Sequence, residues 1–223
     1  MDATKIINHE FKRQYAYDNT VMLNMTLESV TAEIPYNRYG EKLINSALYM
    51  QQSAFVKYVT ANLYKQAIKE YKNSKSGGFP FRAFEAVLKY YVTFNEKCHI
   101  SMYRDQYEYT GGAHGMTVRK SDTFSLKTGR QLPLAAFFLP ERNYNAYLID
   151  IITKEADKNY EESAVYFEDY RDLIRKYYNE SRYFLDEKGL NIYYLQYEIA
   201  PYAAGIIVFN IPYEMIDYPP SCK

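Results

Sequence analysis

The sequence has no tryptophan, only three histidines and only two cysteines among its 223 residues. Metal centres in proteins usually recruit several histidine, cysteine or carboxylate ligands, so this scarcity argues against one. The net charge is zero, because 27 basic residues balance 27 acidic ones. Without an excess of positive charge, neither a nucleic-acid backbone nor an anionic membrane surface is a favourable partner. We therefore expect no metal, no cofactor and no nucleic acid.

Long hydrophobic runs are also missing. The longest apolar stretch, residues 203–209, is far shorter than the roughly 18 residues that a membrane-spanning helix requires. Residues 1–5 lack the apolar core of a signal peptide. The composition fits either a cytoplasmic protein or an exported one whose signal is not in this sequence. We expect no membrane span in this chain.

The two cysteines, Cys98 and Cys222, allow one disulfide at most. Cys222 lies one residue from the end of the sequence, where chains are often disordered. Cys98 falls inside a strand pattern, in which a free cysteine commonly acts as a small buried hydrophobe. We favour this second interpretation over a Cys98–Cys222 bridge.

Tyrosine is abundant, with 27 residues beside 12 phenylalanines. A tyrosine buries an apolar ring while its hydroxyl stays in water, which suits strands, half-buried helix faces and binding surfaces. The favoured explanation is ordinary composition and strand propensity. The alternative is a face for protein recognition. The absence of tryptophan weakens a third explanation, a carbohydrate-binding platform.

The hydrophobic pattern of the first half predicts a strand and then a long helix. Apolar residues alternate over residues 21–27, which indicates a half-buried strand that continues toward Pro35. Over residues 41–71 they recur in steps of three and four, which predicts one amphipathic helix or two in tandem. We expect the glycine-containing polar segment 73–78 to end this helix.

Alternating segments then predict a hairpin and a further strand. The hairpin has strands at residues 88–94 and 100–109, joined by a polar turn at 95–97. The next strand covers residues 116–126 and is closed by a glycine-containing turn at 127–130.

The last part of the sequence mixes helices and strands. Amphipathic helices are predicted over residues 144–155 and 167–177, followed by paired strands at 183–185 and 190–198 and a final strand at 206–211. Because strands and helices do not alternate regularly, the predicted fold class is α+β.

Common catalytic motifs are absent. The sequence has no G-x-S-x-G, no phosphate-binding G-x-x-x-x-G-K-[ST], no H-E-x-x-H and no C-x-x-C. We expect His9 to be solvated near the terminus and His99 to be a packed or edge residue of a strand. The protein is therefore expected not to be an enzyme.

His114 has a more unusual setting, because it follows Tyr109, Thr110, Gly111 and Gly112 and precedes a third glycine. Such glycines allow left-handed backbone and close approach of another chain. One hypothesis is an acid–base or ligand-contacting histidine, oriented by the carboxylate of Asp105 or Glu108. The favoured alternative is a structural turn, because no partner nucleophile or ligand cluster is evident. These loop residues are our first binding candidates.

A second unusual stretch covers residues 197–205. It begins as a strand, is stopped by Pro201 and restarts after Gly205. Tyr202 either points outward as an anchor for a partner or folds back over the sheet. Both alternatives stay open, and Pro201 and Tyr202 are our second pair of binding candidates.

These two stretches also carry a family resemblance. Residues 109–115 read YTGGAHG and residues 197–205 read YEIAPYAAG, followed by IPY at 211–213. The strings closely resemble RsiV-like anti-sigma factor ectodomains and the matching non-catalytic region of PdaC-type peptidoglycan deacetylases. Residues 126–134 and 184–190 resemble the same family, so the resemblance covers nearly the whole chain.

The resemblance implies two subdomains, each a mainly antiparallel sheet with packed helices. Residues 1–115 would form an N-terminal α/β subdomain with a strand, a long helix and a hairpin, and residues 116–223 a C-terminal α+β subdomain. In this family the C-terminal part has been likened to a subdomain of the heat-shock cognate ATPase fold. That likeness concerns architecture alone, because no phosphate-binding loop is present here.

The resemblance also implies a role in recognition. In RsiV-like proteins the ectodomain binds lysozyme outside the cell and controls proteolysis of the anti-sigma factor. In PdaC-like proteins it accompanies a separate deacetylase domain. Neither whole-protein activity carries over, because this sequence has no transmembrane or sigma-binding segment and no deacetylase domain. It also has Ala136-Phe137-Phe138 where many relatives have an acidic residue.

We therefore expect a non-catalytic extracytoplasmic domain, secreted or surface-anchored. Its expected partner is an envelope-associated protein, such as a lysozyme-like hydrolase, or peptidoglycan. The alternative is a hydrolase that uses His114 with Asp105 or Glu108. The sequence leaves the oligomeric state open.

Overall fold

The structure, a computed structural model, describes residues 4–163 and 165–222. It divides into two compact units. The first unit comprises Met1–Tyr90 and Arg104–Val118, and the second comprises Tyr91–Tyr103 and Arg119–Lys223. Strands β3, β4 and β5, whose bounds follow, contribute residues to both units. The subdomain boundary between residues 115 and 116 stays a prediction.

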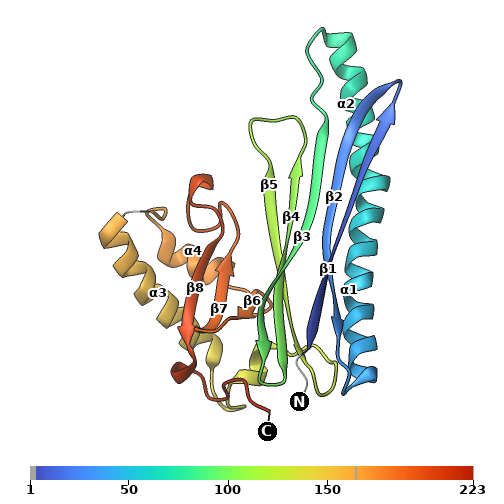
Figure 1. The fold of residues 1–223 in the computed structure, drawn as a ribbon. Coiled ribbons are helices and arrows are strands. Elements are labelled where there is room, and N and C mark those ends of the chain that lie inside the picture. Colours follow the sequence, from blue (N-terminus) through green and yellow to red (C-terminus); the bar gives the residue numbers. More distant parts are fainter. Residues whose placement is uncertain (1–3, 164, 223) are drawn as a thin grey trace. The chain divides into compact units, whose positions relative to one another are not determined.

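The fold is α+β, as the sequence predicts (Figure 1). One sheet has five strands in the order β1-β2-β3-β4-β5, and the other has three in the order β6-β7-β8. The strands are β1 (Lys5–Tyr17), β2 (Thr20–Glu33), β3 (Phe84–Glu96), β4 (His99–Tyr109), β5 (Met116–Ser125), β6 (Tyr183–Leu185), β7 (Gly189–Tyr194) and β8 (Ile207–Pro212). The α-helices are α1 (Arg38–Tyr58), α2 (Tyr64–Gly77), α3 (Tyr144–Ser163) and α4 (Tyr170–Tyr177).

In the first unit, the predicted long helix is confirmed as one continuous helical run. A π-helical turn, Val59–Leu63, joins α1 to α2 without a break. The side chain of Asn37 caps the start of α1 by accepting a hydrogen bond from the Gly40 N–H at 2.9 Å. The prediction that the segment 73–78 ends the helix is confirmed, because α2 stops at Gly77. Gly78 caps this end with φ +70°, a left-handed conformation that glycine adopts without strain.

The predicted strand at residues 21–27 is confirmed as part of β2, which α1 and α2 cover (Figure 1). The helical run connects β2 to β3, and these two strands pair in parallel. Apolar side chains of β2, α1 and β3 form the buried core of this unit. Among them are Leu23, Met25, Ile44, Leu48, Phe55, Phe84, Ala86 and Leu88.

Strand β1 was not predicted. It pairs antiparallel with β2 along its whole length, yet nearly all of its side chains are exposed or only partly buried. Alternation of apolar and polar residues arises when one face of a strand is buried. Because neither face of β1 is buried, its sequence carries no such alternation.

The predicted hairpin is confirmed as β3 and β4, with a turn one residue further along. Lys97 and Cys98 occupy it with φ of 50° and 61°, as a two-residue hairpin turn of the primed type requires. The next strand is confirmed as β5, and Gly129, with φ +71°, lies in the tight turn after it.

In the second unit, the two helices and three strands are present with shifted ends. Helix α3 extends beyond the predicted residue 155 to Ser163, and α4 begins at Tyr170. Strand β7 ends at Tyr194, because the chain then turns instead of continuing to residue 198. The core lies between α3, α4 and the sheet of β6, β7 and β8. It includes Leu148, Ile152, Ile174, Leu190, Ile192, Tyr194, Phe209 and Ile211.

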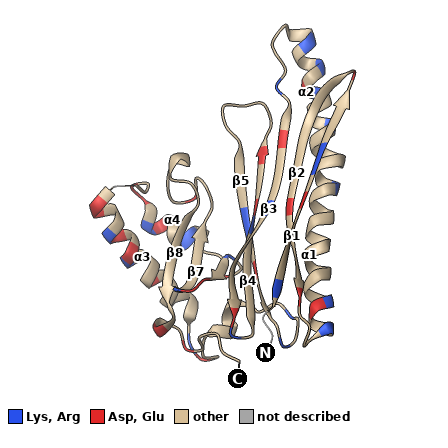
Figure 2. Cartoon of the chain, in the orientation of Figure 1, with Lys and Arg blue, Asp and Glu red and all other residues tan. Residues whose placement is uncertain are grey.

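Acidic and basic residues alternate along α3 (Figure 2). Two spaced pairs, Lys154 with Asp150 and Lys158 with Glu155, form ion pairs on its surface. No helix in the described ranges is long and apolar enough to cross a membrane.

Candidate functional site

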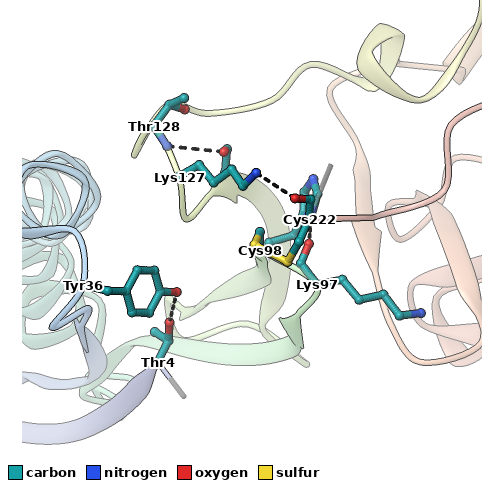
Figure 3. Close-up of a disulfide and its surroundings, with 9 residues drawn as sticks. Thr4, Tyr36, Lys97, Cys98, Lys127, Thr128 and Cys222 are labelled. Carbon is teal, nitrogen blue, oxygen red and sulfur yellow. Dashed lines mark hydrogen bonds between the residues drawn. A yellow bond between two sulfur atoms is a disulfide. The ribbon is translucent and has the colours of Figure 1, made fainter. Parts of the chain in front are cut away.

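Cys98 and Cys222 form a disulfide, with their Cα atoms 5.1 Å apart (Figure 3). The prediction of an unpaired Cys98 inside a strand is therefore wrong. Cys98 lies in the β3–β4 turn, and its carbonyl accepts a hydrogen bond from the Leu126 N–H. Lys127 donates to the Cys222 carbonyl at 2.7 Å. These contacts hold the C-terminal segment against the turn, which sequence distance alone does not indicate.

The segment that leads to Cys222 is packed as well. The N–H groups of Asp217 and Tyr218 both donate to the carbonyl of Phe137. Arg142 forms an ion pair with the Asp217 carboxylate at 2.5 Å. Ile216 is buried in the core of the second unit. The disulfide therefore fixes the end of a C-terminal segment that these hydrogen bonds and the burial of Ile216 already hold in place.

In the β7–β8 loop, the residue with the most exposed aromatic side chain, Tyr197, also has a strained backbone conformation. Tyr197 has φ +65°, and its side chain and backbone together are 48% exposed. A non-glycine residue in the left-handed region costs roughly 1–3 kcal/mol and persists only where neighbouring contacts impose it. Such outliers cluster at ligand-contacting sites.

Glu198 supplies the contacts that impose this conformation. Its carboxylate oxygens accept from Arg182 Nη1 at 2.8 and 2.7 Å, and one of them accepts from the Leu195 N–H at 2.7 Å. Both side chains of the ion pair are mostly buried, at 21% and 13% exposure. The next residue, Ile199, is buried and accepts from the Phe167 N–H. The loop is thus anchored on both sides of Tyr197.

Tyr202 lies beside Tyr197, with ring centroids 5.6 Å apart. Pro201 between them is exposed, whereas Tyr202 is partly buried. The sequence left open whether Tyr202 points outward or folds back over the sheet, and neither alternative describes it fully. The Tyr202 ring is partly buried and packs beside the exposed ring of Tyr197. The turn closes at Gly205, whose φ of 71° and ψ of −147° belong to a region that only glycine adopts readily.

The first unit holds the other candidate loop, between β4 and β5. The Tyr107 ring lies so close to Gly115 that an added Cβ would collide with it and would lie 2.6 Å from the Glu108 carbonyl oxygen. Gly111 has φ +92°. Arg82 donates to the Tyr109 hydroxyl at 3.3 Å. These contacts give Gly115 a packing role, and its positive φ gives Gly111 a backbone role.

His114 lies in the β4–β5 loop, and the two carboxylates considered for orienting it, Asp105 and Glu108, lie in β4. His114 is exposed and its Nδ1 lies 3.2 Å from the Gly115 carbonyl oxygen. The Glu108 carboxylate accepts from Tyr58 at 3.0 Å and from Gln106. Burial, reinforced by the hydrogen bond to Glu108, raises the pKa of the Tyr58 hydroxyl. Asp105 and Glu108 are three residues apart in one strand, so they face opposite sides of the sheet and cannot both orient His114.

The other two histidines, His9 and His99, each lie within hydrogen-bond distance of a neighbouring residue. His9, expected to be solvated, is exposed in β1 with Nε2 2.9 Å from the Thr31 hydroxyl. The packed role expected for His99 is confirmed, since its Nδ1 lies 2.6 Å from the Lys97 carbonyl oxygen and burial lowers its pKa. Across residues 4–163 and 165–222, no three His, Cys, Asp or Glu side chains come close enough to hold a metal ion.

The predicted candidates thus fall into two groups. In the first unit, Tyr109 is the last residue of β4, and the β4–β5 loop that follows holds Thr110, Gly111, Gly112 and His114. In the second unit, Pro201 and Tyr202 share the β7–β8 loop.

Sequence reasoning missed Tyr197, Glu198 and Arg182 as site residues. The backbone conformation of Tyr197 and the pairing of Glu198 with Arg182 depend on contacts across 16 positions of sequence. No local pattern reveals them.

Two families match the chain by sequence. The family described as "Deacetylase PdaC" matches residues 6–117, half of the chain, and the family described as "Protein of unknown function (DUF3298)" matches residues 135–214. No curated protein matches the chain significantly.

Two solved structures are similar over nearly the full length. A member of the DUF3298 family from Bacteroides fragilis NCTC 9343 is 19% identical with a TM-score of 0.73, and the match covers 98% of this chain and 95% of that one. A DUF3298 family protein from Pseudomonas aeruginosa PAO1 is 15% identical with a TM-score of 0.61, covering 97% and 96%. At these identities the likeness shows the fold. The chain belongs to the PdaC family and continues into a DUF3298 domain.

Proposed function

We propose that this protein is a non-catalytic recognition domain of the cell envelope. It binds an envelope-associated protein, such as a lysozyme-like hydrolase, or a cell-wall ligand through the β7–β8 loop. The observation that carries the proposal is Tyr197, an exposed ring on a strained backbone that a mostly buried ion pair holds in place.

The physical basis is preorganisation. Binding costs conformational entropy wherever a loop or side chain must be ordered. The hydrogen bonds that the Glu198 carboxylate accepts from the Leu195 N–H and the Ile199 carbonyl accepts from the Phe167 N–H order this loop before a partner binds. Tyrosine then offers a large apolar ring with a polar tip and few rotatable bonds, which is why it is enriched at the energetic centres of interfaces.

The disulfide supports a location outside the cytoplasm. Disulfides persist in oxidising compartments and are rare where glutathione and thioredoxin keep thiols reduced. The bridge joins positions 124 residues apart, and Lys127 donates a hydrogen bond to the Cys222 carbonyl beside it. A structural bridge of this kind fits a secreted or surface-anchored domain.

Binding is tested by calorimetry with a panel of lysozymes and with purified soluble peptidoglycan fragments. We expect heat of binding with one of them, and at least a tenfold weaker affinity for Tyr197→Ala. Tyr218→Ala is the matched control, because Tyr218 is also 48% exposed in the same unit. No heat with any probe at about 100 μM protein, or equal losses in both variants, would contradict the proposal.

Localisation is tested separately by alkylating free thiols in intact cells that carry the native gene. We expect Cys98 and Cys222 to be protected from the alkylating reagent until a reductant is added. Two thiols that react with the reagent before a reductant is added would contradict the extracytoplasmic part of the proposal and leave the binding part standing.

A further inference from the structure

Strand β1 is the edge of the five-stranded sheet, and only β2 pairs with it among the described residues. It is long and largely exposed, and Phe11 at its centre is 50% exposed. An exposed edge offers a row of backbone N–H and C=O groups to a further strand. Natural edges of this kind are either protected or used for pairing.

The sequence of β1 is complementary to itself when two copies run antiparallel about Phe11. In this register Glu10 of one copy lies opposite Lys12 of the other, and the symmetry makes this pair twice. Phe11 then faces Phe11 across the axis. Ile7 meets Tyr15 on the same face of the sheet as Phe11, since residues two or four apart share a face.

The remaining pairs are compatible with this register. Asn8 lies opposite Gln14, which allows an amide–amide hydrogen bond. His9 lies opposite Arg13.

Neighbouring registers are less favourable. In such a dimer the two-fold axis passes between the two copies of one residue, which lie opposite each other. Moving the axis by one residue changes every cross-strand pair between the two copies. An axis at Glu10 brings the two Glu10 carboxylates together, and an axis at Lys12 brings the two ammonium groups together. Like charges directly opposite each other destabilise strand pairing. Of these three, only the axis at Phe11 avoids a like-charge pair at its centre.

The structure also limits how far the pairing extends. The Tyr64 hydroxyl donates to the Ala16 carbonyl at 2.7 Å, and the register of β1 on β2 shifts between Tyr15 and Ala16. That end of the edge is irregular and already has a side-chain partner. The regular part from Ile7 to Tyr15 is the segment available to a second copy.

We propose that two copies of this chain pair through β1, antiparallel and centred on Phe11, so that their sheets join across a two-fold axis. This dimer contact goes beyond the proposed recognition function and does not depend on it.

Charge reversal tests the register. Sedimentation equilibrium up to about 500 μM protein should show a monomer–dimer equilibrium for the natural sequence. Glu10→Lys and Lys12→Glu each place like charges opposite one another twice, and each should weaken dimerisation at least tenfold. Within one chain Glu10 forms an ion pair with Lys12 at 2.6 Å and lies opposite Glu28. Glu10→Lys therefore loses the contact with Lys12 and removes the like-charge contact with Glu28. Because the Glu10 and Lys12 side chains are more than half exposed, the fold should stay intact.

Mixing the two single variants is the decisive measurement. Their charges are complementary only between the chains, so a heterodimer should form although each variant alone stays monomeric. The double variant Glu10→Lys with Lys12→Glu should dimerise again. Circular dichroism and thermal melting of each variant separate loss of pairing from loss of folding.

A cysteine at the axis gives an independent readout. Phe11→Cys should form an intermolecular disulfide under mild oxidation, because directly opposite Cβ atoms lie about 5 Å apart. Gln14→Cys is the control, since its two copies would lie roughly 20 Å apart along the strands. A natural protein that remains monomeric at 500 μM, or a mixture that forms no heterodimer, overturns the proposal.

Discussion

Arg182 Nη1 lies 2.8 and 2.7 Å from the two carboxylate oxygens of Glu198, and neither side chain is more than about a fifth exposed. The same carboxylate accepts from the Leu195 N–H. One ion pair therefore organises the turn that begins directly after β7 and includes Tyr197. Since a buried charge without its partner is costly, this pair makes the loop sensitive to either side chain.

Removing one partner of this pair should destabilise the second unit. For Arg182→Ala we expect a loss of about 2 kcal/mol in the free energy of unfolding, less than for a fully buried pair because some solvent reaches the charges. Chemical denaturation measures it. The double variant Arg182→Ala with Glu198→Gln should be more stable than the sum of the single losses predicts, and strict additivity would mean that the two groups act independently.

Gly205→Ala should destabilise the protein by roughly 1–3 kcal/mol, because its φ of 71° with ψ of −147° is adopted readily only by glycine. Gly112→Ala is the matched control. An added Cβ there meets no atom closer than 4.0 Å, so we expect a change below about 0.5 kcal/mol. Thermal melting of the two variants checks this, and equal melting temperatures would argue against strain at Gly205.

Replacing both cysteines by serine should lower the free energy of unfolding by about 2–5 kcal/mol, because the bridge restricts the unfolded chain over 124 positions. The natural protein should lose comparable stability when dithiothreitol is added. The variant with Cys98→Ser and Cys222→Ser should not respond to the reductant. A response in that variant would mean that dithiothreitol acts elsewhere.

Acid should destabilise the start of α1 through Glu41. Its carboxylate accepts from the Ile34 N–H at 2.6 Å, and with Arg38 beside it this lowers the pKa of Glu41. A carboxyl whose folded pKa is depressed stabilises the protein above its unfolded pKa, near 4.3, and that stability is lost as the pH falls through the folded pKa.

The measurement is denaturation between pH 6 and about pH 2. Glu41→Gln should show a shallower loss of stability below about pH 4 than the natural protein, because one titrating group is gone. Glu187→Gln, at an exposed turn position, is the control. An identical acid profile for Glu41→Gln and the natural protein would remove this explanation.

The elements that the sequence predicts are those with one buried face. Alternation over residues 21–27 reflects the packing of β2 beneath α1, and the helical period over residues 41–71 reflects the same contact from the other side. Strand β1 has no buried face, so hydrophobic periodicity cannot reveal it. Its place in the sheet depends on hydrogen bonds to β2.

The candidate loops follow the same division. The glycines of YTGGAHG and YEIAPYAAG predict tight turns, and Gly111 and Gly205 adopt positive φ in the structure. Which side chains those turns expose is decided by contacts from elsewhere in each unit. Arg182 determines the setting of Tyr197, and Tyr58 engages the carboxylate of Glu108.

The sequence by itself determined the α+β class, the order of most elements and the family, because these depend on local periodicity, turn residues and long motifs. Only the tertiary structure decided the Cys98–Cys222 bridge, the edge position of β1 and the exposure of Tyr197. The bridge and the Arg182–Glu198 pair join residues 124 and 16 positions apart, and such contacts form only when packing outweighs the entropy of ordering the chain. Strand β1 pairs with its neighbour in sequence, but it has no buried face and therefore no hydrophobic pattern.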